Sequence, residues 1–281
     1  MENPNKSVGI LAMAATAFLW SIAGLFIKVI DWNPIAIAGM RSLIASIVIF
    51  IYLKHPRIHL SFPQIAASVA SAATMLLFVS ANKTTTAANA ILLQYCAPVF
   101  TVFISAIFLK ERTRVEQFVA FPLVMAGMIF MFFDELSGGK LFGNLLAIMS
   151  ALTFSFYIVF MRMQKDGSPL ESILLAHWLT AGICIIISLF LPAPHVTLKS
   201  LFSIVVLGFV QSGLSAILFS IAIKRVSAVQ ANLIAVIEPV FNPGWVFIVI
   251  GETPGSHALI GGGIIVLAVT IASIITAHRR E

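Results

Sequence analysis

Apolar residues fill most of this chain in runs of about 20, and short polar segments separate the runs. A helix needs about 20 apolar residues to cross the hydrocarbon core of a bilayer. The runs lack the strict alternation of apolar and polar positions that a spanning strand would show. The pattern therefore predicts ten spanning helices, at about residues 8–30, 34–54, 63–82, 86–109, 115–133, 141–163, 169–190, 199–222, 226–249 and 256–277.

The composition places the chain in the all-α membrane class. Of its 281 residues, 60% are hydrophobic and 10% are charged, and the mean hydropathy is +1.04. A soluble domain carries about 25% charged residues, so this chain lacks the polar surface to be covered by water. The two cysteines, Cys96 and Cys184, lie within predicted spans, where packing is the expected role rather than a disulfide. The connectors are too short to form a soluble domain.

The basic residues gather at one side of the predicted bundle. With the N-terminus in the cytoplasm, the cytoplasmic side holds twelve of the seventeen lysines and arginines, whereas Lys28, Lys83, Lys140 and Lys199 lie at the outer side. The positive-inside rule therefore predicts a multi-pass protein of the plasma or inner membrane with both termini cytoplasmic. Basic residues at helix ends act as topology signals, so the net charge of +6 predicts no nucleic-acid partner.

The two halves of the chain repeat each other in sequence. Each half would hold five spans, and because five is odd, the second half would enter the membrane with the opposite polarity. We therefore predict two inverted repeats of five helices, residues 1–136 and residues 137–281. The matching positions are Pro98 with Pro239, Phe100 with Phe241 and Glu111 with Glu252 at an offset of 141, and Gly9 with Gly143 and Lys28 with Arg162 at an offset of 134.

These features resemble the EamA-type members of the drug/metabolite transporter superfamily. The resemblance covers the whole chain and rests on five plus five helices, Arg41 early in span two, Glu238-Pro239 in span nine, and the segment ends Phe108–Glu111 and Ile250–Glu252. It implies a central cavity lined mainly by spans one, three, four, six, eight and nine. One departure is that Ala97 stands in the first half where Glu238 stands in the second, which makes the site chemically asymmetric.

Three ionisable residues inside predicted spans are candidates for moving charge. An ionised group at mid-bilayer costs about 2.5–3.5 kcal/mol on insertion scales, so such residues need a role. Glu238 is a candidate for binding a proton or a substrate ammonium group, and the alternative is a structural hydrogen bond near Pro239. Arg41 could hold a carboxylate or form an intramembrane pair, for example with Glu238. His177 is a candidate proton relay or a neutral hydrogen-bonding group between helices.

Aromatic and amide side chains supply the candidate substrate-binding positions. Such residues around a pocket would suit a largely apolar, zwitterionic solute, although small and hydroxyl residues in membranes are more often packing surfaces. Pro98 and Pro239 are predicted hinges in spans four and nine. The predicted substrate-binding residues are Trp20, Ser21, Phe78, Gln94, Tyr95, Phe154, Gln211, Phe219, Asn232, Glu238, Asn242 and Trp245.

The sequence therefore predicts a secondary transporter, acting by alternating access without a cofactor or metal. The chain has no P-loop and no Asp within a span, which argues against ATP as the energy source and against a carboxylate-rich metal site. From the resemblance we expect export of neutral or aromatic amino acids, with a proton as a candidate coupling ion, and a monomer would suffice. The alternatives are a cationic amine transporter with Glu238 as counter-ion, a lipid-modifying membrane enzyme, and a passive channel or assembly component.

Overall fold

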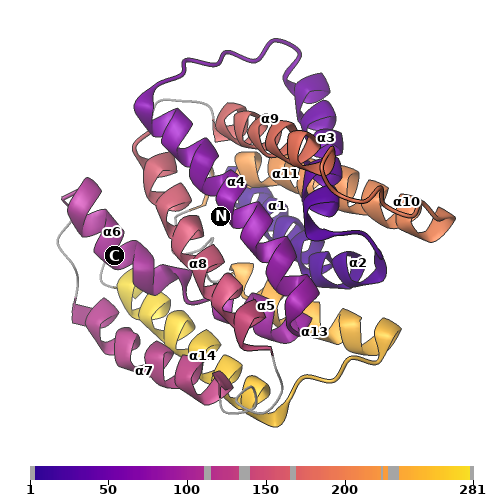
Figure 1. Cartoon of the computed structure of the whole chain (residues 1–281). Coiled ribbons are helices and arrows are strands. Elements are labelled where there is room, and N and C mark those ends of the chain that lie inside the picture. Colours follow the sequence, from indigo (N-terminus) through magenta and orange to yellow (C-terminus); the bar gives the residue numbers. More distant parts are fainter. Residues whose placement is uncertain are drawn as a thin grey trace.

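The computed structural model describes residues 4–110, 115–132, 140–164, 169–222, 224–226 and 234–278, and all secondary structure in these ranges is helical. Helices satisfy their own backbone hydrogen bonds, which hydrocarbon requires. Within the described ranges, seven helices are long and apolar enough to cross a membrane, and Ile237–Ile250 and Ser256–Ile271 are shorter apolar helices. The structure thus shows a multi-pass helical bundle (Figure 1). The count of ten spans stays a prediction.

The helices follow the predicted runs closely. Their bounds in chain order are α1 Pro4–Ser21, α2 Ala23–Val29, α3 Pro34–Leu53, α4 Phe62–Thr84, α5 Ala87–Gln94, α6 Ala97–Phe108, α7 Val115–Phe132, α8 Leu141–Arg162, α9 Pro169–Ser188, α10 Leu198–Val205, η1 Val206–Leu214, α11 Ser215–Ala222, α13 Ile237–Ile250 and α14 Ser256–His278.

Among the predicted spans that the structure describes in full, three are not single regular helices. The span expected at 8–30 breaks at Ile22 into α1 and α2. The span at 86–109 breaks at Tyr95 and Cys96, so that Pro98 falls in the first turn of α6, where its missing N–H is tolerated. The span at 199–222 contains a π-helix, η1, between α10 and α11. Helix breaks and π-helical turns are frequent at functional sites in membrane proteins.

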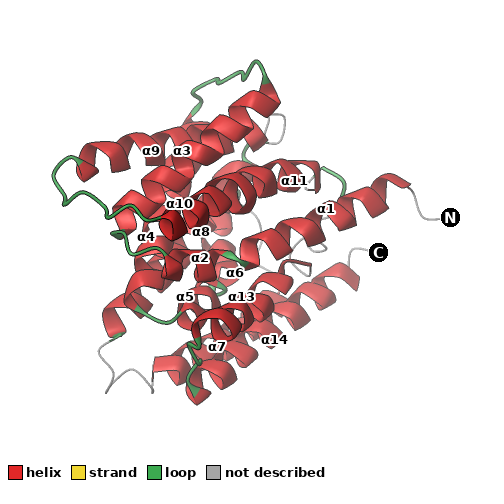
Figure 2. Ribbon diagram, turned by 90° about the vertical axis from the view of Figure 1, so that its right-hand side faces the viewer, coloured by secondary structure: helices red, strands yellow, loops and turns green. Residues whose placement is uncertain are grey.

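Helices from the two halves of the chain pack against each other in pairs. The largest contacts join α4 to α8, α7 to α14 and α3 to α9, and α1 packs along α11. Figures 1 and 2 both show α3 beside α9 and α7 beside α14. Figure 2 also shows the start of α1 and the end of α14 on the same side of the bundle. Which side of the membrane each terminus faces stays a prediction.

Glycines allow the closest approaches between these helices. A Cβ on Gly143 of α8 would lie 2.7 Å from the backbone nitrogen of Thr85, and a Cβ on Gly9 of α1 would lie 3.0 Å from Val226. Small residues let membrane helices pack at short range, where dispersion replaces the hydrophobic effect as the source of stability.

Candidate functional site

The first part of the candidate site lies where α13 crosses α1. The indole nitrogen of Trp245 donates a 3.0 Å hydrogen bond to the Ser21 hydroxyl, which in turn donates to the Phe18 carbonyl at 2.7 Å. The rings of Phe18 and Phe241 lie 5.9 Å from the Trp245 ring, between centroids. Ser21 and Trp245, both predicted from the sequence, are therefore in direct contact although 224 positions separate them.

A second aromatic pair lies on the other side of α1. The indole nitrogen of Trp20 donates to the Ser215 hydroxyl at 3.0 Å, and its ring lies 5.5 Å from the Phe219 ring. Ile234 and Ala235, just before α13, pack in the same cluster. Consecutive residues on α1 thus point towards α11 and α13, which places Trp20, Ser21, Phe219 and Trp245 around one helix.

Glu238 stands in the first turn of α13, within the predicted ninth span. Its carboxyl group makes no hydrogen bond or ion pair with any residue in the described ranges, and the hydroxyl of Tyr95 lies within electrostatic range of it. Within the described residues, the structural alternative in which Glu238 hydrogen-bonds near Pro239 has no supporting contact. The suggested ion pair between Arg41 and Glu238 is also absent from the described residues.

Asn242 lies one turn after Glu238 and is fully buried. Neither the oxygen nor the nitrogen of its amide has a hydrogen-bond partner. Gly24 of α2 lies opposite, and any side chain there would collide with the Asn242 amide oxygen. An unpaired buried amide costs free energy, so this pair of positions resembles a site that a polar ligand group completes.

The other predicted residues are in separate places. Gln94 donates to the Ser150 hydroxyl at 2.8 Å, and Phe78 is buried in the main hydrophobic core. The Phe154 ring lies 5.9 Å from that of Tyr157, and Gln211 of η1 accepts a 2.9 Å hydrogen bond from Ser212. The substrate-binding roles of Gln94 and Phe78 stay predictions. Asn232 lies outside the described residues.

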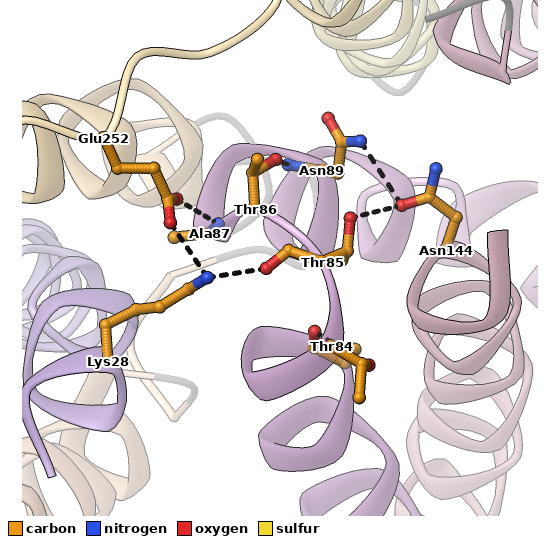
Figure 3. A network of polar contacts seen from close by, with 9 residues as sticks. Lys28, Thr84, Thr85, Thr86, Ala87, Asn89, Asn144 and Glu252 are labelled. Carbon is orange, nitrogen blue, oxygen red and sulfur yellow. Dashed lines mark hydrogen bonds and ion pairs between the residues drawn. The ribbon is translucent and has the colours of Figure 1, made fainter. Parts of the chain in front are cut away.

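A polar network at the far end of α2 was not predicted as a site. Lys28 forms an ion pair with Glu252 at 2.9 Å and donates to the Thr85 carbonyl at 2.6 Å, and Glu252 accepts from the backbone N–H of Ala87 at 2.8 Å. Figure 3 shows that these contacts join α2 and the segment after α13 to the start of α5. The charge bias predicts that this end of the bundle faces outward.

The same network continues to α8. The Thr85 hydroxyl donates to the Asn144 side-chain oxygen at 2.7 Å, and the Asn89 amide donates to the same oxygen at 3.3 Å (Figure 3). We refer to Lys28, Thr85, Ala87, Asn89, Asn144 and Glu252 as the Lys28–Glu252 network. The only sequence signal for it was the repeat, which matches Lys28 with Arg162 and Glu252 with Glu111.

The remaining charged candidates lie elsewhere. Arg41 and His177 are both buried, 6% and 2% exposed, where α3 packs on α9. Arg41 influences His177 electrostatically across this contact. Within the described ranges, no three His, Cys, Asp or Glu side chains are grouped as metal ligands would be.

Comparison with known proteins agrees with this architecture. A model of the EamA-like transporter family matches the chain twice, over residues 7–133 and residues 141–274. An uncharacterized transporter of Archaeoglobus fulgidus is 26% identical over 94% of this chain and 96% of its own length. The uncharacterized transporter YoaV of Bacillus subtilis is 19% identical over 82% of this chain and 84% of its own.

A mammalian relative and a solved structure add to this. Solute carrier family 35 member G1 of Mus musculus is 27% identical over 60% of this chain and 50% of its own. A crystal structure superimposes with a TM-score of 0.69 over 96% of this chain and 98% of the other, at 19% identity. At that identity, the superposition is evidence for the fold alone.

Proposed function

Because the chain belongs to the EamA-like transporter family, within the drug/metabolite transporter superfamily, we propose that it is a secondary transporter that moves small solutes by alternating access. The relatives of greatest coverage are themselves named transporters. The membrane would be a plasma or inner membrane, with both termini cytoplasmic, as the charge bias predicts.

The packing pairs support two inverted halves of five helices, residues 1–136 and 137–281. An inverted repeat relates span two to span seven and span five to span ten, and these are the pairs α3 with α9 and α7 with α14. It also relates the pair α4 and α8 to the pair α11 and α1, and both are in contact. Gly143 meets Thr85, as Gly9 meets Val226 at the matching positions of the other half. Alternating access follows if the two halves exchange conformations around a central site.

One observation directs the choice of substrate. Within the described residues, Glu238 and Asn242 present a carboxyl and an amide without hydrogen-bond partners, on the helix that also carries the aromatic residue Trp245. Such groups bind the ammonium and carboxylate of a zwitterion, and aromatic rings bind its apolar side chain. We therefore propose neutral or aromatic amino acids as the cargo, moved outward, with a proton as the coupling ion and Glu238 as the residue that carries it.

Transport by purified protein in proteoliposomes tests this. The Glu238→Gln variant keeps the shape of the side chain and removes its charge, and we expect its counterflow of amino acids to fall at least about tenfold. Glu171→Gln is the matched control, because it makes the same substitution in the first turn of α9, where the Glu171 carboxylate accepts an exposed hydrogen bond from the backbone N–H of Arg57 at 2.7 Å. Unchanged counterflow rate and affinity in Glu238→Gln would exclude Glu238 from substrate binding, and unchanged transport driven by an imposed pH gradient would exclude it from the proton pathway.

A cationic amine is the second candidate cargo. The observation that favours it is a carboxyl group without a hydrogen-bond or ion-pair partner in the described residues, on the same helix as the aromatic rings of Phe241 and Trp245, since aromatic rings and carboxylates together bind ammonium groups. The two cargoes separate in a competition assay with the wild-type protein. Amines that lack a carboxylate would inhibit transport as strongly as amino acids only if the site binds the ammonium group alone.

A further inference from the structure

The contact between α3 and α9 buries a cationic side chain in the interior of the bundle. Arg41 lies on α3 and is 6% exposed. Arginine keeps its charge in proteins, so a protonated guanidinium group must be accommodated there. Two tight contacts fix its surroundings, because Gly39 packs on Cys184 of α9 and Gly208 of η1 packs on Ile44 and on the Arg41 carbonyl.

The guanidinium group lacks partners. Its Nε and Nη1 atoms are buried without a hydrogen bond, and no carboxylate in the described ranges lies close enough to form an ion pair or to influence it. A permanent charge with no counter-charge is among the most costly groups to place in a membrane interior. The contact between α3 and α9 therefore buries a cation whose charge no carboxylate in the described ranges offsets.

A second unpaired donor faces the same region from another helix. His177 of α9 is 2% exposed, its Nδ1 atom is buried without a partner, and the imidazole lies within electrostatic range of Arg41. The nearby hydroxyl groups make no hydrogen bond to Arg41 or His177 in the described ranges. Ser42 and Thr180 donate to the Met75 sulfur, at 3.7 and 3.8 Å.

We propose that Arg41 and His177 form a binding site for a small monovalent anion of the chloride class, held between α3 and α9 as the counter-ion of Arg41. Guanidinium and imidazole groups donate hydrogen bonds to such an anion, and the charge of the anion offsets the buried cation. The close helix contacts at Gly39 and Gly208 on either side favour a small ion over a bulky oxyanion. This site is separate from the Glu238 region and does not depend on the identity of the transported solute.

Anion-dependent stability of the purified protein provides the test. Melting temperatures are measured in chloride, bromide, acetate and gluconate at constant ionic strength. A ligand that binds only the folded state raises its melting temperature, and roughly 5 °C is expected at concentrations about a hundredfold above the dissociation constant. We expect saturable increases with chloride and bromide, and little or none with gluconate. Acetate distinguishes a halide site from a site for carboxylates.

Variants locate the effect. Arg41→Gln should abolish the chloride dependence, and His177→Gln should weaken binding several-fold. Lys199→Gln, which removes an exposed cation at the start of α10, should behave as the wild type. If Arg41→Gln fails to fold, bromide-soaked crystals of the wild type serve instead, and an anomalous peak between Arg41 and His177 is expected.

The outcomes separate clearly. Wild-type stability that is independent of the anion, a chloride effect that persists in Arg41→Gln, or bromide-soaked crystals without a peak at this position would each overturn the proposal. Acetate that stabilises as strongly as chloride would reassign the site to carboxylates.

Discussion

The ion pair between Lys28 and Glu252 gives a quantitative prediction about the end of the bundle that faces outward by the charge bias. For a central site to open at that end, α2, α5 and the segment after α13 have to separate, and the pair joins them. The substitution Glu252→Gln removes the charge but leaves an oxygen that can still accept from the N–H of Ala87. It therefore isolates the ion pair from the hydrogen bond at the start of α5.

The structure sets the size of the effect. The side chains of Lys28 and Glu252 are 18% and 23% exposed, so the pair is largely but not fully removed from solvent. Exposed ion pairs contribute about 0.2–1 kcal/mol, and hydrogen bonds to charged groups about 1.5–3 kcal/mol. Between these limits, losing the pair should destabilise the closed end by about 1–2 kcal/mol. That free energy corresponds to a roughly 5- to 30-fold increase in the open population.

Cysteine labelling measures this population. Leu25 is 9% exposed and packs with Ala87 and Val246 beneath the ion pair, so a cysteine at position 25 is protected while this end is closed. In a background that lacks Cys96 and Cys184, its labelling by a membrane-impermeant maleimide should accelerate 5- to 30-fold when Glu252→Gln is added.

Two controls make the result decisive. Glu171→Gln removes a carboxylate that also accepts a backbone N–H but forms no part of this network, and it should leave the labelling rate unchanged. Lys28→Met with Glu252→Gln should accelerate labelling by less than the product of the single effects, because both remove one interaction. A rate within twofold of the parent, or fully multiplicative effects, would refute a closing role for the pair.

Three further predictions follow from the packing. Gly143→Ala places a Cβ 2.7 Å from the backbone after α4, so we expect the free energy of unfolding to fall by about 1–3 kcal/mol in a denaturation assay. The control Gly182→Ala has open space around the new Cβ and should be neutral or slightly stabilising. Ser21→Ala leaves the α13 indole N–H unpaired and should cost about 1–3 kcal/mol in the same assay, unless the indole proves to bind another group. By the repeat, Arg162 and Glu111, which lies outside the described residues, should form the equivalent ion pair at the cytoplasmic end. A transport assay checks this: reversing either charge alone should abolish transport, and swapping both charges should restore it.

Much of the fold could be predicted from the sequence because the bilayer constrains it strongly. Apolar runs give the helices within a few residues, and Pro98 marks the break between α5 and α6. The break at Ile22 and the π-helix η1 have no comparable signal, because the residues there are ordinary helix formers in a membrane. Neighbouring helices, rather than local preference, determine these irregularities.

The candidate site was predictable only in part. Glu238 and Arg41 can be recognised as candidates from the sequence, because placing a charged group in hydrocarbon is costly. Contacts between distant segments cannot be recognised in this way. Neither the hydrogen bond from Trp245 to Ser21 nor that from Thr85 to Asn144 follows from residue type. Phe78 is buried in the main hydrophobic core, and its predicted role as a lining residue stays a prediction.

The polar groups of this bundle fall into two classes that indicate how ligands could control its conformation. In the Lys28–Glu252 network, the charged groups are matched by protein partners, so closing that end satisfies them without help. Within the described residues, nitrogen atoms of Arg41 and His177 and the amide of Asn242 are buried without hydrogen-bond partners, so conformations that bury them are costly until a ligand supplies these contacts. A ligand shifts a conformational equilibrium only by its difference in affinity between the states. Groups that are unpaired when buried provide that difference, which is why transport should depend on them more strongly than protein stability does.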